Sequence, residues 1–429
     1  MTNDTWQLSE RAARRLKKRY RRERRLKALG ILAICLALGV LALLLGSVIA
    51  RGYPAFVKTE IALEISFEAK LIDPGGRLEP SQLAKGKYGK ILRQALFETF
   101  PDVRERAERR KLTKLLSKAA RFELRRMVVD RPELVGTTKR VWLSAASDVD
   151  MLIKGNMSRD APEAERRLND RQLAWIDHLA AAGNLRTVFN GRFFTGSDSR
   201  EPELAGIGGA LMGSFWTLLI TLVLAFPLGV AAAIYLQEFA PKNRLTDFIE
   251  VNINNLAAVP SIVFGLLGLA IFIQLFELPR STAIVGGLTL MLMTLPTIII
   301  ATRAALAAVP PSIREAAHGV GASPVQVVFH HVLPLALPGI MTGAIIGMAR
   351  ALGETAPLLM IGMVAFIVDI PSAPFDSATA LPVQIFLWAD SPERGFEEKM
   401  SAAILVLLAF LMIMNGLAVF LRKRFEIRW

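Results

Sequence analysis

The sequence contains only one cysteine, Cys35, so no disulfide bond can form within the chain. None of its histidines stands at a metal-binding spacing, and they are His178, His318, His330 and His331. The G-x4-G-K-[ST] pattern is absent, so we expect no P-loop ATP site. The apolar segments also lack the H-E-x-x-H and G-x-S-x-G patterns of hydrolases. We therefore predict a chain with no metal, cofactor or catalytic residue of its own.

Long uncharged apolar runs dominate the 429 residues, of which 52% are hydrophobic. The mean hydropathy is +0.39. A helix needs about 20 apolar residues to cross the hydrocarbon core of a membrane. We therefore predict an all-α polytopic membrane protein with six transmembrane helices, in residues 29–50, 205–237, 251–276, 281–302, 332–368 and 400–421. The first run exceeds the apolar core of a signal peptide, which is about 7–15 residues, so we expect a retained anchor.

Positive charge flanks the first and the last apolar run, and the formal net charge is +14. Eleven Lys and Arg residues stand within residues 11–27. Such clusters mark the cytoplasmic side, and six spans place both termini on one side. We predict a cytoplasmic arm at 1–28 and a cytoplasmic tail at 422–429. The arm is expected to form a helix that lies on anionic lipid headgroups. One stripe of this helix, along a single face, would consist of Leu8, Ala12, Leu16 and Tyr20. Nucleic-acid binding is the disfavoured alternative.

A polar insert at 51–203 separates the first predicted span from the other five. Because the arm is cytoplasmic, the insert is expected outside, in the periplasm of a Gram-negative cell. Residues 59–67 alternate as in a strand, and residues 73–76 form a turn signal. Amphipathic helices are predicted in 83–97, 104–129 and 170–182. These patterns favour a small α+β domain of unassigned role.

The loop at 304–334 carries an unusual pattern between two predicted spans. Glu315, Ala316 and Ala317 favour a helix, and the two alanines leave a low surface that another protein can approach. Gly321 permits a turn, and Pro324 stands where a second helix could begin. The basic residues of this loop, Arg303 and Arg314, predict a cytoplasmic position. The plainer alternative is an ordinary helical hairpin between two spans.

Two charges, Arg350 and Glu354, interrupt the fifth predicted span. They are four residues apart, so they can pair on one helical face. A charge at the bilayer centre costs at least roughly 2.5–3.5 kcal/mol, so such residues usually face a bundle interior or a water-filled path. Arg350 can bind two oxygens of an oxyanion, and Thr355 and Ser261 could add neutral donors. The alternative is a purely structural pair near the cytoplasmic end of the span.

The loop spacing E-A-A-x3-G-x11-L-P, from Glu315 to Pro334, resembles the "EAA" loop of ABC-importer permeases. That resemblance implies a helix, a glycine turn and a second helix that dock on a separate ATPase. Residues 350–357, 259–266 and 235–241 resemble phosphate importers, most closely their PstA-type permease. The resemblance covers about half of the chain. It implies a type I ABC-importer permease core, which we predict over residues 206–421 with five helices.

The resemblance also implies the roles of particular residues. The predicted ATPase-coupling residues are Glu315, Ala316, Ala317, Gly321, Leu333 and Pro334. The predicted translocation residues are Arg350, Glu354, Thr355 and Ser261. His331 departs from the family, which usually has Ile or Val there, so we expect altered packing of the second loop helix.

The implied partners are a PstC-type permease, a PstB-type ATPase dimer that binds ATP and Mg, and an external PstS-type phosphate-binding protein. The implied location is the bacterial inner membrane. Two alternatives stay open. The first is a permease for another oxyanion, such as sulfate or phosphonate. The second is a membrane-anchored sensor or scaffold that works through its external domain.

Overall fold

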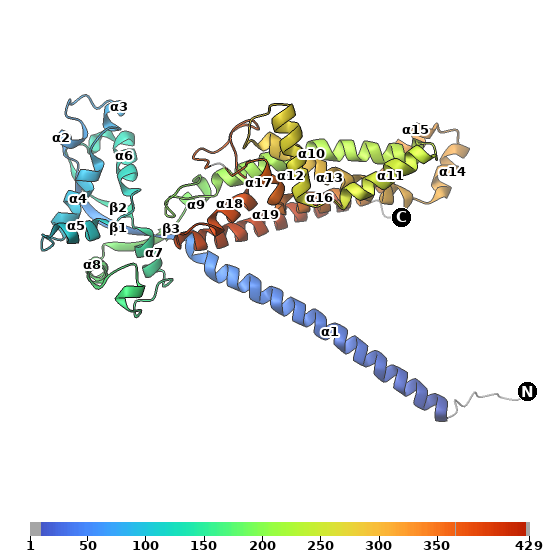
Figure 1. Cartoon of the computed structure of the whole chain (residues 1–429), viewed down its shortest axis with the longest axis horizontal. Coiled ribbons are helices and arrows are strands. Elements are labelled where there is room, and N and C mark those ends of the chain that lie inside the picture. Colours follow the sequence, from blue (N-terminus) through green and yellow to red (C-terminus); the bar gives the residue numbers. More distant parts are fainter. Residues whose placement is uncertain (1–9, 365, 426–429) are drawn as a thin grey trace, which may run out of the picture. The chain divides into compact units, whose positions relative to one another are not determined.

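The computed structural model describes residues 10–364 and 366–425 and divides the chain into two units, 1–51 and 52–429 (Figure 1). The described residues of the first unit all belong to one helix, α1 (Glu10–Gly52). The basic arm and the first predicted span are therefore one continuous helix. Of the predicted stripe, Leu16 and Tyr20 are exposed, whereas Leu8 lies outside the described residues.

The second unit begins with an α+β region built on a three-stranded antiparallel sheet. Its strands are β1 (Val57–Ser66), β2 (Thr138–Ser144) and β3 (Leu185–Phe189), in the order β2-β1-β3. The predicted strand at 59–67 is thus the central strand, paired to both neighbours. Its alternation directs Ile61, Leu63 and Ile65 into the core.

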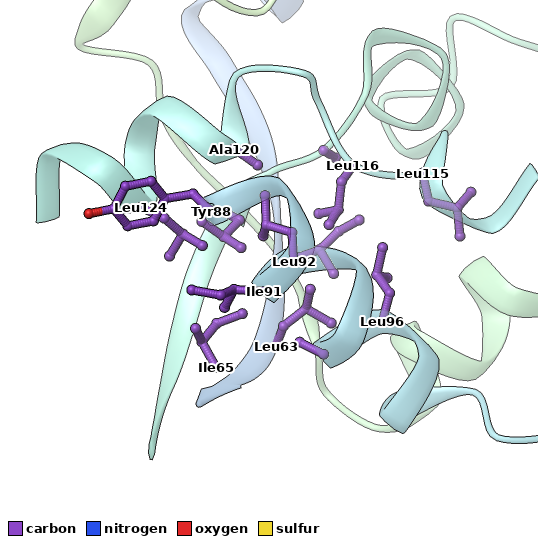
Figure 2. Close-up of a cluster of buried hydrophobic side chains, with 14 of the residues drawn as sticks. Leu63, Ile65, Tyr88, Ile91, Leu92, Leu96, Leu115, Leu116, Ala120 and Leu124 are labelled. Atoms are coloured by element: carbon purple, nitrogen blue, oxygen red, sulfur yellow. The ribbon is translucent and has the colours of Figure 1, made fainter. Parts of the chain in front are cut away.

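Eight short helices accompany this sheet: α2 (Ala69–Ile72), α3 (Pro80–Leu83), α4 (Tyr88–Thr99), α5 (Arg106–Thr113), α6 (Ala120–Asp130), α7 (Ser147–Ile153), α8 (Asp170–Ala181) and α9 (Arg192–Thr195). Helix α4 packs on β1 and on α6. Figure 2 shows Leu92 and Leu96 of α4 and Leu124 of α6 in one buried cluster with Leu63 and Ile65 of β1. The predicted long helix at 104–129 is wrong, because the chain turns between α5 and α6. Leu115 and Leu116 of that turn point into the same core.

Buried ion pairs join this α+β region to the last helix of the chain, α19 (Gly395–Phe425). Lys154, only 6% exposed, contacts Asp150 at 2.5 Å and Glu398 at 3.3 Å. Asn156 also donates to Glu398. Burial raises the pKa of the nearby Glu203 carboxyl. Because a buried charge is costly unless it is paired, these contacts fix the insert to the start of α19.

The remaining helices are α10 (Gly208–Ile234), α11 (Arg244–Ala257), α12 (Ser261–Gly268), α13 (Ala283–Ala307), α14 (Pro311–Gly319), α15 (Pro324–Gln326), α16 (Leu333–Gly353), α17 (Ala356–Met360) and α18 (Leu381–Ala389). Most of them are apolar, whereas α11 and α14 also carry charged residues. Helix α13 packs between α10 and α16, and α16 also contacts α19. The contacts use small residues, as membrane helices commonly do. Gly229 of α10 meets Ile298, and Gly343 of α16 meets Ala301.

Five helices of the described residues are long and apolar enough to cross a membrane, or six if one bent pair counts as a single span. The bent pair replaces the continuous span predicted at 251–276. Helices α11 and α12 meet at 102°. Pro260 lacks the amide hydrogen that a continuous helix requires, and it stands at the break as the N-cap of α12.

The fifth predicted span is also shorter than expected. Helix α16 ends at Gly353, and the described residues of 355–368 form the five-residue α17 followed by turns and irregular backbone. Gly362, with φ of 86°, supports one of these turns. The predicted outer loop at 369–399 contains α18, a short helix that was not predicted.

Candidate functional sites

The EAA-like loop folds as a helix, a glycine turn and a second helix. Helix α14 ends at Gly319, and Gly321 adopts φ of 88°, a conformation that strains any residue with a side chain. The next helix begins at a capping box, in which Ser323 and Gln326 exchange hydrogen bonds between side chain and backbone. A π-helical stretch, Val327–Val332, then leads into α16.

One face of this loop is buried and the other is exposed. Ala317 packs with Val327, Val328 and Val332 in an apolar cluster that includes the ends of α10 and α13. The exposed side carries the residues Glu315, Ala316, Val320, Val325 and Phe329. Val320 is 84% exposed, although it is a large aliphatic side chain. We define these five residues as the loop face. It is a compact apolar surface beside a carboxylate.

The other predicted coupling residues support the loop from behind. Leu333 and Pro334 are half-buried at the start of α16. His331 is exposed and takes no part in the apolar cluster of the loop.

Arg314 holds the loop to the helix bundle. From the sequence, its charge predicted only that the loop is cytoplasmic. Its guanidinium donates to both carboxylate oxygens of Glu238, at 2.7 and 3.2 Å. It also donates to the carbonyl oxygens of Val309 and Leu306 at the end of α13. Both partners of the ion pair are largely buried, at 23% and 11% exposure. A bidentate pair with two further acceptors fixes the orientation of α14.

Arg350 and Glu354 form the predicted pair at the far end of α16 from the loop. The Nε atom of Arg350 lies 3.5 Å from Oε1 of Glu354. Arg350 lies about 25 Å along the helix axis from Leu333, at about 1.5 Å per residue. The side chain of Arg350 is 45% exposed, whereas that of Glu354 is 18% exposed. One long bond leaves most of the guanidinium donors available.

Ser261 and Thr355 stand at the starts of two helices that pack on each other. Ser261 is the first residue of α12, and Thr355 is the N-cap of α17. The two helices are in close contact because Gly265 has no side chain. The structure thus brings the segments of Ser261 and Thr355 together, next to the end of α16. It shows no hydrogen bond from either hydroxyl within the described residues.

We expect Gly265→Val to separate α12 from α17. A Cβ atom at Gly265 would lie 2.7 Å from Cα of Pro357 and 2.8 Å from Cβ of Met360. Overpacking of this kind costs about 1–3 kcal/mol. The purified protein should therefore unfold at a lower temperature and transport more slowly. Gly416→Val is the control, since a Cβ atom there meets nothing within 4 Å. Equal unfolding temperatures for the two variants would contradict the close contact.

Two protein-family models match the chain. One, described as "Binding-protein-dependent transport system inner membrane component", matches residues 225–427. The other, described as "Domain of unknown function (DUF3333)", matches residues 13–163 and so covers α1 and much of the insert.

Curated relatives and a solved structure match about half of the chain. The probable ABC transporter permease YqgI of Bacillus subtilis is 38% identical over 39% of this chain and 57% of its own length. The phosphate transport system permease PstA of Mycobacterium leprae is 34% identical over 48% of this chain and 68% of its own length. An inward-facing crystal structure of the MetNI methionine ABC transporter is 17% identical, with a TM-score of 0.41, over 52% of this chain and 95% of that chain.

The apolar helix bundle and its exposed loop face define a polytopic membrane permease. The chain belongs to the ABC transporter permease family that includes the PstA proteins, and it is a permease subunit of an ABC importer. It spans 57% and 68% of the lengths of the two relatives described above.

Proposed function

We propose that this permease imports inorganic phosphate across the bacterial inner membrane. The names of relatives support the substrate, because several are PstA phosphate permeases, among them those of Mycobacterium leprae and Yersinia pestis. The exposed guanidinium of Arg350 supports it chemically, since its planar fork matches two oxygens of a tetrahedral oxyanion. Glu354 positions Arg350 while the path is empty.

The observation that carries the transport mechanism is the loop face, held on the ends of α10 and α13 by Arg314. An ATPase that docks on this face can transmit its closure to both helices. Glu315, Ala316 and Ala317 then form the docking helix. Gly321 sets the turn, and Leu333 and Pro334 pass the movement into α16. ATP and Mg bind to that partner ATPase dimer.

The remaining partners follow from this mechanism. A second permease subunit of PstC type completes the pore, and an external PstS-type binding protein delivers phosphate. The loop face then lies in the cytoplasm together with both termini, and the α+β insert lies outside. The basic half of α1 lies on anionic lipid headgroups. With this orientation Arg350 is far from the cytoplasmic end of α16, which disfavours a purely structural pair at that end.

Uptake of radioactive phosphate tests this proposal against the other oxyanions. Cells that lack their own phosphate importers receive this chain with its partner subunits. We expect uptake that unlabelled phosphate inhibits and that equal concentrations of sulfate or phosphonate leave unchanged. Inhibition by sulfate or phosphonate would assign another oxyanion. If assembled complexes transport no oxyanion, the result favours the sensor or scaffold alternative, in which the insert carries the function.

A further inference from the structure

Within the insert, positive charge is concentrated in one segment. Residues 81–131 contain fifteen Lys and Arg residues against six Asp and Glu residues. Helices α4 and α6 belong to this segment and pack against each other. Between them lies an open groove of about 560 Å³. We define its cationic lining as the basic groove: Lys87, Lys90, Arg93, Arg121 and Arg125.

The basic groove gathers five cations in one lining without a carboxylate. Its lining includes no Asp or Glu. In the part of the chain that the structure describes, none of its five cations forms an ion pair. Some cations elsewhere in the insert are paired, such as Arg186 with Glu60 and Lys118 with Glu201. Like charges three or four residues apart on a helix destabilise it by a few tenths of a kcal/mol. The groove thus keeps an arrangement that disfavours the folded chain by itself.

An aromatic side chain stands beside these cations. Phe122 lines the groove and is 48% exposed, and the guanidinium of Arg121 lies 4.5 Å from the centre of its ring. Exposed arginine and aromatic residues together are typical of the centres of protein interfaces. A small ligand is usually enclosed in a mainly apolar pocket, and this groove is open and basic.

We infer that the basic groove docks an acidic face of the external binding protein. Five unpaired cations on two helices need several negative charges at matching spacing, which carboxylates on a folded partner provide. Such pairing raises the rate of encounter and fixes orientation. This inference rests on the proposed function, because that function supplies a soluble partner on the side of the insert.

Charge reversal tests the groove with a matched control on the same domain. The assembled importer is placed in phosphatidylcholine nanodiscs, and its Kd for the phosphate-loaded binding protein is measured. Arg121→Glu with Arg125→Glu reverses two of the five positive charges in the groove. Arg110→Glu with Arg126→Glu makes the same change in net charge at exposed positions outside the groove. We expect at least tenfold weaker binding for the groove pair and less than twofold change for the control pair. Wild-type binding should also weaken from 50 to 300 mM NaCl.

Three results would overturn the inference. The first is equal binding by the groove pair and the control pair. The second is no binding of the loaded protein by the wild-type importer. The third is groove-dependent binding to phosphatidylglycerol vesicles without any effect on the binding protein, which would assign a lipid surface. Phosphate uptake by the wild type is measured in parallel. If the wild type takes up no phosphate but binding of the external protein depends on the groove, only the proposed substrate is contradicted. If the wild type takes up phosphate normally but binding does not depend on the groove, only the inference is contradicted.

Discussion

Arg350→Gln is expected to reduce phosphate uptake by about 10- to 100-fold while the importer still assembles. A hydrogen bond to a charged group contributes about 1.5–3 kcal/mol, and each 1.4 kcal/mol corresponds to about a tenfold change. Gln keeps a polar, hydrogen-bonding side chain but is shorter and has no charge. Arg350→Lys keeps the charge without the planar fork, so it should retain intermediate uptake. Initial uptake rates, normalised to the assembled complex in the same membranes, measure both effects.

A double variant separates transport from structure. If Arg350 served only to neutralise Glu354, then Arg350→Gln combined with Glu354→Gln would leave no unpaired charge and should restore uptake. If Arg350 meets the anion, the double variant stays as slow as Arg350→Gln alone. Restored uptake would therefore contradict a role in the translocation path. The 45% exposure of Arg350 and its single 3.5 Å contact favour the second result.

Arg314→Ala is expected to uncouple the permease from its ATPase. The change removes four hydrogen bonds and leaves Glu238, which is 11% exposed, without its partner. Loss of one partner of a largely buried pair costs about 3–5 kcal/mol. Helix α14 should then leave its place on α10 and α13. We expect uptake to fall at least tenfold and the ATPase to separate from the permease during purification.

His331→Ala provides the control for this loop. His331 is exposed in the same loop and takes no part in its apolar cluster. Exposed substitutions of this kind usually change stability by less than about 0.5 kcal/mol. Uptake and copurification of the ATPase should match the wild type. If Arg314→Ala also retained the ATPase and normal uptake, the contacts of Arg314 with Glu238 and the end of α13 would have no part in coupling.

Much of the loop could be predicted because its structure depends on near neighbours. The helix at Glu315–Ala317 and the turn at Gly321 follow from preferences of those residues and the ones beside them. The central strand followed from its alternation. The predicted helix at 104–129 failed because amphipathic spacing continues across the bend at Leu115 and Leu116, where the core sets the direction of the chain.

In the candidate translocation site, too, local features were predicted and contacts between distant segments were not. The pairing of Arg350 with Glu354 follows from their four-residue spacing. The span at 251–276 was predicted as continuous and its break at Pro260 was missed, because the residues that accommodate a sharp bend lie elsewhere in the chain. Helix α12 rests on α17 through Gly265, and that contact joins segments about a hundred residues apart.

By itself the sequence determined that the chain enters a membrane, where its basic flanks lie and which loop resembles an ATPase-docking surface. Hydrophobic length, charge and short motifs are properties of one continuous segment, so they can be read in order along the chain. Only the tertiary structure decided that Arg314 binds Glu238 and that α4 and α6 form one basic groove. These features arise from contacts between distant segments. Their geometry depends on how the whole chain packs, because each partner is placed by its own helix.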